Sequence, residues 1–121
     1  MVKKYERANF SSKDSGNLTW ANVSIRVFGA PKYLNKKNQL LFEQYIISSF
    51  KTFPCSICRG HTKNIFDKCP LRKSDLISRE TLIDWLYKFH NEVNKSLGKE
   101  SISFKNYYTF WSSKIVGYSM E

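Results

Sequence analysis

Cysteine, proline and glycine are all scarce in this chain. Its 121 residues include three cysteines, three prolines and five glycines. Three cysteines are too few for a disulfide-rich scaffold. The absence of a Gly-x-Gly-x-x-Gly fingerprint excludes a Rossmann-type dinucleotide fold on pattern. The sequence also lacks internal repeats and low-complexity segments, and its length fits one domain.

Long apolar runs are absent as well. The longest are far too short to span a bilayer, and the polar residues 1–7 do not contain the apolar segment of a signal peptide. From the sequence we therefore expect a cytoplasmic protein without a membrane partner.

Acidic residues are half as numerous as basic ones. The chain has 10 acidic and 20 basic residues, which gives a formal net charge of +10. Such a charge favours acidic partners or nucleic acid. The lysines are scattered, however, and Lys3-Lys4 and Lys36-Lys37 are only pairs. We interpret the charge as a solvated basic surface and do not expect nucleic-acid binding.

The apolar residues recur at the three- and four-residue spacing of helices. The predicted helices cover residues 19–28, 38–50, 55–68, 78–97 and 103–116. No segment shows convincing strand alternation, so the expected fold class is all-α, a bundle with short connections. We expect residues 1–15 to form a flexible N-terminal arm, residues 16–116 the helical domain and residues 117–121 a C-terminal tail.

Cys55 and Cys58 form a Cys-x-x-Cys pair at the expected start of a helix. Two thiols at this spacing can close a small disulfide ring. A helix N-terminus lowers thiol pKa values, and Arg59 adds positive charge beside the pair. The pattern therefore indicates a dithiol that cycles by thiol–disulfide exchange.

Zinc binding is the alternative interpretation of the same segment. Cys55, Cys58, His61 and Cys69 would make a Cys3His set, which is chemically acceptable for a structural zinc ion. With the positive charge, such a site would suggest a small nucleic-acid-binding module. A continuous helix over residues 55–68 would not fold four ligands around one ion, so we favour the dithiol.

A polar surface on the fourth predicted helix could hold a cofactor for that dithiol. His90 and Asn94 are four residues apart and share one helical face, while Asn91 and Lys99 flank them. Imidazole and amide groups can contact the edges of flavin or adenine rings, and a lysine can contact a pyrophosphate. A surface polar patch is the alternative.

Several segments together resemble the Erv/ALR-type FAD-linked sulfhydryl oxidases. Residues 85–99 are similar to the signature Trp-Leu-x-x-x-His-Asn-x-Val-Asn-x-x-Leu-x-Lys at every defining position, and residues 53–61 resemble the redox segment. Gly16 and Trp20 match the Gly-x-x-x-Trp start of the first flavin helix. Trp111 lies where the family places an aromatic ring on adenine.

The resemblance implies a four-helix bundle plus one short extra helix, with FAD at the bundle mouth, in a homodimer. It implies that Cys55 takes electrons from a protein dithiol and that Cys58 lies beside the flavin. The flavin is then expected to pass the electrons to O2, which gives H2O2. The FAD-binding residues that it implies are Gly16, Trp20, Ser24, Tyr33, Tyr87, His90, Asn91, Val93, Asn94, Leu97, Lys99, Phe110 and Trp111.

The chain departs from the family pattern at two positions of the first flavin segment. The family's His four residues after the Trp is Ser24 here, and the Tyr of its Tyr-Pro is Ala30, with Tyr33 nearby. A family member that has lost its flavin and acts as a binding protein therefore remains an alternative.

Only one cysteine remains outside the Cys-x-x-Cys pair. Without a second pair to act as a shuttle, we expect Cys55 to meet the substrate directly, on a thioredoxin-like partner protein. Cys69 is expected to be a half-buried structural thiol. The compact form is similar to those that large cytoplasmic DNA viruses encode, which suggests a viral protein in the host cytoplasm or the virion.

Overall fold

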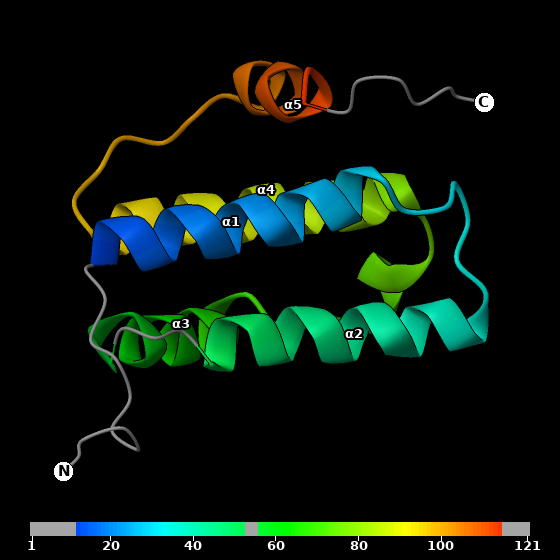
Figure 1. Ribbon diagram of the computed structural model, residues 1–121, viewed down its shortest axis with the longest axis horizontal. Helices are drawn as coiled ribbons and strands as arrows, with labels where there is room; N and C mark the ends of the chain where they lie inside the picture. Colours follow the sequence, from blue (N-terminus) through cyan, green and yellow to red (C-terminus); the bar gives the residue numbers. More distant parts are fainter. Residues whose placement is uncertain (1–11, 53–55, 115–121) are drawn as a thin grey trace, which may run out of the picture.

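Two layers of two helices, crossed by a fifth helix, form the protein in a computed structural model (Figure 1). The structure describes residues 12–52 and 56–114, and for residues 12–17 and 56–61 the backbone alone. The helices are α1 (Ser12–Phe28), α2 (Lys36–Lys51), α3 (Ser56–Lys68), α4 (Arg79–Ser96) and α5 (Phe104–Ser112). Helices α1 and α4 form one layer, α2 and α3 the other, and α5 lies across the outside of α1 and α4. The predicted all-α bundle with one short extra helix is confirmed.

Two local differences from the sequence-based expectation concern polar segments. Helix α1 begins at Ser12, so it includes the last residues of the expected arm, 12–15. A short 3-10 helix, η1 (Lys73–Leu76), lies in the expected connection between α3 and α4. Apolar periodicity marks the buried part of a helix and not its first polar turn, which explains the early start of α1. Residues 1–11 and 115–121, with the expected tail, lie outside the described residues.

Three of the helices begin with a side-chain cap. The side chains of Asn35, Ser78 and Ser103 accept hydrogen bonds from the backbone N–H groups three residues further on, at 2.8, 3.2 and 3.2 Å. Each bond satisfies one of the N–H groups that have no partner within the helix. The caps therefore fix where α2, α4 and α5 start.

Aromatic rings fill the centre of the bundle. Phe50 of α2 and Phe89 of α4 are fully buried, with ring centroids 5.0 Å apart. Phe66 of α3 packs on Phe89 at 4.7 Å, and Trp85 does so at 4.8 Å. Burial of one such ring stabilises a fold by about 1.5–3 kcal/mol. This cluster joins α2, α3 and α4, and Trp20 of α1 packs on it with its ring centroid 4.9 Å from that of Phe50.

The loops at one end of the bundle hold α1 and α4 in antiparallel register. An isolated bridge joins Tyr33 and Ser78, and the Arg79 N–H donates to the Lys32 carbonyl at 3.1 Å. The connection after α1 is thereby tied to the start of α4. Among the described residues, no helix combines the length and apolar character that a membrane crossing requires.

Candidate active site

His90 lies between two aromatic rings on the polar face of α4. Its imidazole stacks on Trp20 of α1, with ring centroids 4.2 Å apart and planes at 20°. On another side it meets the ring of Tyr107 from α5, at 5.8 Å and 70°. Burial lowers the pKa of His90 to about 4, and the positive charge of Lys99 makes a smaller contribution in the same direction. The imidazole is therefore neutral at physiological pH.

The last turn of α4 extends this face toward Lys99. Val93 and Asn94 are buried one turn beyond His90. The helix then ends in a Schellman turn, in which Gly98 adopts a φ of 73° and the Lys99 N–H donates to the Asn94 carbonyl at 2.8 Å. This turn fixes the backbone of Lys99 close to Asn94, while the side chains of Lys99 and Leu97 are exposed.

Tyr87 and Asn91 use their polar groups to hold the connection between α4 and α5. Both the Tyr87 hydroxyl and the Asn91 amide donate to the Ile102 carbonyl, at 2.8 and 3.1 Å. The Ile102 N–H donates in return to Oδ1 of the Asn91 side chain at 3.0 Å. Asn91 and Tyr87 therefore position α5 over the face that carries His90.

Helix α5 supplies one contact residue that the sequence analysis did not select. Tyr107 is buried and contacts His90, whereas the selected Trp111 is half-buried and Phe110 is exposed. The rings of Phe110 and Trp111 meet edge to face at 5.0 Å. In the sequence, Tyr107 belongs to an apolar stripe of the last helix, and nothing in that stripe marks it as the member that reaches His90.

Two of the selected residues do not line the accessible side of His90, one because it is distant and one because it is buried. Tyr33 is 71% exposed and pairs with Ser78, which precedes His90 by twelve residues, or about 18 Å along α4. Ser24 is near, one turn after Trp20, but it is completely buried. The structure therefore gathers Trp20, His90 and the end of α4, and does not add Tyr33 to them.

The backbone of α3 brings the dithiol segment toward the same place. Cys55 lies outside the described part of the structure, which gives only the backbone of Gly16, Cys58 and His61. However, the Trp85 indole donates to the Cys69 carbonyl at 3.3 Å, and Phe66 packs on Phe89, so α3 and α4 run antiparallel. The start of α3 therefore lies beside the C-terminal end of α4, where Asn94 and Lys99 are located.

The same helix argues against the zinc alternative. Cys69 follows Cys58 by eleven residues, and the Cys69 N–H still donates to the Ile65 carbonyl, so the two lie about 16 Å apart along the helix axis. Ligands of one zinc ion lie about 2.0–2.3 Å from it. Among the described side chains, no three His, Cys, Asp or Glu residues gather in a way that could hold a metal ion.

Comparison with known proteins agrees with this arrangement. The profile of the Erv1/Alr family matches residues 17–112. The chain belongs to the Erv1/Alr family. It is 32% identical over 87 residues to a protein named FAD-linked sulfhydryl oxidase from African swine fever virus, covering 72% of this chain and 68% of that one. It is 28% identical to a probable FAD-linked sulfhydryl oxidase of Acanthamoeba polyphaga mimivirus, covering 78% of this chain and 66% of that one.

A solved structure places the Erv1/Alr chain in a known fold. The FAD-binding domain of Erv1 from Saccharomyces cerevisiae superposes with a TM-score of 0.75 at 19% identity, covering 92% of this chain and all of that one. At this identity the likeness establishes the fold. The matched sequence spans about two thirds of the length of the two viral relatives.

Proposed function

We propose that this Erv1/Alr protein is a FAD-dependent thiol oxidase that forms disulfides in protein dithiols. The observation that supports the proposal is that two segments, distant in the sequence, lie close together in the structure. Helix α3 carries Cys58 in its first turn and starts beside the end of α4, which presents neutral His90 stacked on Trp20. The names of the viral relatives, FAD-linked sulfhydryl oxidase and probable FAD-linked sulfhydryl oxidase, agree with this activity.

The Cys55–Cys58 pair performs the exchange with the substrate. One thiolate of the substrate attacks the sulfur of Cys55 and displaces Cys58 as a thiolate. The second substrate thiolate then attacks the mixed disulfide and displaces Cys55, so the substrate leaves oxidised and the pair is reduced. The start of α3 and Arg59 favour the thiolate form of Cys58.

The residues of the proposed FAD-binding set fit FAD by their chemistry. Trp20 and Trp111 offer aromatic surface for flat rings, His90 and Asn94 offer polar groups for ring edges, and Lys99 offers a positive charge for the pyrophosphate. When bound, FAD supplies the two-electron acceptor for the pair and the reaction with O2 that yields H2O2. The remaining members of the proposed set are Gly16, Tyr87, Asn91, Val93, Leu97 and Phe110.

The proposed substrate is a dithiol on a small thioredoxin-like protein that meets Cys55 directly. One cysteine remains outside the pair in this sequence, and a single thiol cannot serve as an internal dithiol shuttle. A small folded partner that presents two neighbouring thiols needs no such shuttle.

Purification and two cysteine variants test the oxidase. We expect the purified protein to be yellow, with flavin absorbance at about 450 nm. Cys55→Ser and Cys58→Ser should each retain FAD and lose at least about a hundredfold in oxidation of a protein dithiol, because neither can form the exchanging disulfide. A colourless protein that binds one equivalent of zinc, or variants that turn over at wild-type rates, would contradict the proposal.

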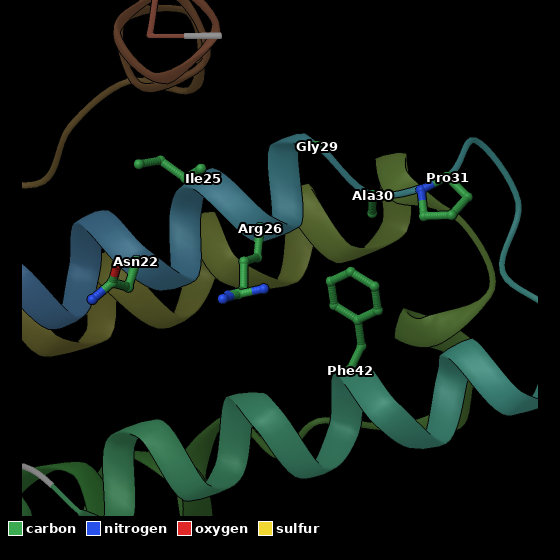
Figure 2. A pocket seen from close by; sticks show the side chains of 7 residues that line it. All are labelled: Asn22, Ile25, Arg26, Gly29, Ala30, Pro31 and Phe42. Carbon is green, nitrogen blue, oxygen red and sulfur yellow. The ribbon is translucent and has the colours of Figure 1, made fainter.

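A homodimer through the face of α1 and α2 is the proposed assembly. Four apolar residues on these helices are about half or more exposed: Leu18, Ile25, Leu40 and Leu41. A hollow of about 460 Å³ lies between the two helices, and Figure 2 shows Arg26 of α1 and Phe42 of α2 extending into the space between them. A second copy would cover these exposed side chains, whose burial is favourable.

Sedimentation of two matched variants tests the dimer. Ile25→Lys introduces a charge on the proposed interface, at a residue that is 49% exposed. Ile77→Lys places the same charge at a 53% exposed residue just before α4. We expect Ile25→Lys to sediment as a monomer and Ile77→Lys to behave as the wild type, a dimer. Equal masses for both variants would disprove this interface.

A further inference from the structure

Three buried polar atoms near His90 lack hydrogen-bond partners in the described structure. They are Ser24 Oγ of α1, Nδ1 of His90 on α4 and the Tyr107 hydroxyl of α5, and solvent reaches none of them. A buried polar atom without a partner costs about 1–3 kcal/mol, so three in one place need an explanation. Because solvent cannot touch these atoms, a bound cofactor cannot touch them in this conformation either.

The side chains that carry these atoms are in mutual contact. The Tyr107 ring meets the His90 ring at 5.8 Å. Burial raises the pKa of Tyr107, while a hydrogen-bonding interaction with the Ser24 hydroxyl lowers it in part. The two hydroxyls therefore lie near each other, although neither has a hydrogen-bond partner in the described structure. Tyr107 is thus the middle member of a row that runs from Ser24 to His90.

We propose that Ser24, Tyr107 and His90 form a hydrogen-bonded relay that fixes the tautomer of His90. The Ser24 hydroxyl donates to the Tyr107 oxygen, and the Tyr107 hydroxyl donates to Nδ1 of the imidazole. The proton of neutral His90 then resides on Nε2. Closing the relay requires these side chains to shift, because the three atoms have no hydrogen-bond partner in the described structure.

The direction of the relay follows from counting donors. In the proposed direction, Ser24 and Tyr107 each donate to the next member, and the remaining proton is on Nε2, which is not among the buried atoms without a partner. In the opposite direction, Nδ1–H donates to Tyr107 and Tyr107 donates to Ser24, which leaves the Ser24 proton buried without an acceptor. An unsatisfied buried donor is costly, so the first direction is favoured.

The relay makes Tyr107 and Ser24 positioning residues for His90. With Nδ1 occupied by Tyr107, the nitrogen available to a bound molecule is Nε2, and it is always a donor. His90 would therefore select an acceptor atom on the edge of a flat heteroaromatic ring. This last consequence rests on the proposed function, whereas the tautomer itself does not.

Nitrogen NMR of the histidine side chains tests the relay directly. The sequence contains two histidines, so His61 serves as an internal reference in the ¹⁵N-labelled full chain. We expect His90 to show the Nε2–H tautomer, with Nδ1 shifted as a hydrogen-bonded acceptor. Tyr107→Phe keeps the ring and removes the hydroxyl. It should shift Nδ1 toward a free acceptor, and Ser24→Ala should produce a smaller shift in the same direction.

A neighbouring tyrosine provides the matched control. Tyr108 lies on the same helix, half-buried against Phe28 at 5.6 Å and Phe104 at 5.7 Å. Tyr108→Phe should leave the His90 signals unchanged. In the FAD-loaded protein, Tyr107→Phe should also weaken FAD binding by about fivefold, as expected for one perturbed hydrogen bond.

The outcomes separate the relay from the proposed function. An Nδ1–H tautomer in the wild type, or identical His90 signals in the wild type and Tyr107→Phe, would overturn the relay. Because the wild-type spectrum alone reports the tautomer, the test survives if Tyr107→Phe does not fold. The spectrum can be recorded with and without FAD, so a chain that fails to bind FAD rejects the proposed function without deciding the relay.

Discussion

A single neutral imidazole links acid stability to the candidate active site. The pKa of His90 is about 4 in the folded protein and about 6.5 in an unfolded chain. Well above pH 6.5 the imidazole is neutral in both states, so its titration does not change the free energy of unfolding there. As the pH falls below 6.5, the unfolded chain binds the proton first, so the folded state loses stability until the folded pKa is reached.

The size of this loss can be measured by chemical unfolding. The two pKa values set an upper bound of about 3 kcal/mol, and partial solvent contact of the ring should reduce it to about 1–3 kcal/mol between pH 7 and pH 4. Carboxylates titrate in the same range, so His90→Gln serves as the reference. We expect the urea unfolding free energy of the wild type to fall more steeply with acid than that of His90→Gln. Parallel pH profiles would show that His90 titrates normally.

Among the helices, the attachment of α5 determines whether Tyr107 covers His90. This nine-residue helix is too short to be stable alone. Its N-terminal connection is held by the two hydrogen bonds between Asn91 and Ile102 and by the Tyr87 hydroxyl. Because Tyr107 is carried by α5, this attachment decides whether the His90 face is closed.

Removal of the Asn91 amide should loosen α5 selectively. We expect Asn91→Ala to lower the unfolding free energy by about 1 kcal/mol, since both bonds to Ile102 are lost at a partly exposed site. Hydrogen exchange of the α5 amides should accelerate more than that of α4. Tyr87→Phe, which leaves the Asn91 bonds in place, should have the smaller effect. Uniform acceleration over all helices would contradict a local role.

The helices themselves could be predicted from the sequence, but their contacts could not. Apolar spacing located α2 and α4 to within a few residues of their ends, and Ser78 and Gly98 mark the real cap and terminal turn of α4. The same reasoning missed η1, whose short polar turn carries no periodicity. It also missed Tyr107, because an aromatic stripe shows which side of a helix is buried and not which neighbour it meets.

Part of the candidate site likewise depends on three-dimensional placement. His90 and Asn94 share a face as their spacing predicts, and the structure adds Trp20 to it from α1. Tyr33 is close to Ala30 in sequence, yet the loop pairs it with Ser78 at the other end of α4. The position of Tyr33 in the sequence did not reveal its distance from His90, because the α1–α2 connection turns toward the start of α4.

At the scale of the whole molecule, the route of the electrons depends on the distance between Cys58 and Cys69. The two cysteines lie about 16 Å apart along α3 and its last turn, whereas Cα atoms joined by a disulfide lie within about 7 Å. Cys69 is half-buried, as expected from the sequence, and its carbonyl accepts from the Trp85 indole. Exchange between Cys69 and Cys58 within one folded chain is therefore excluded by geometry.

Cys69→Ser should consequently leave the proposed oxidase intact. Burial, with smaller effects of Glu92 and Asp75, raises the pKa of the Cys69 thiol, so little of it is the reactive thiolate at neutral pH. We expect turnover within about twofold of the wild type with dithiothreitol and with a protein dithiol alike, and the same sedimentation coefficient. Non-reducing electrophoresis of the wild type should show no disulfide-linked dimer. A large loss of turnover confined to the protein dithiol would instead place Cys69 in the transfer, through a neighbouring molecule, since its own Cys58 is out of reach.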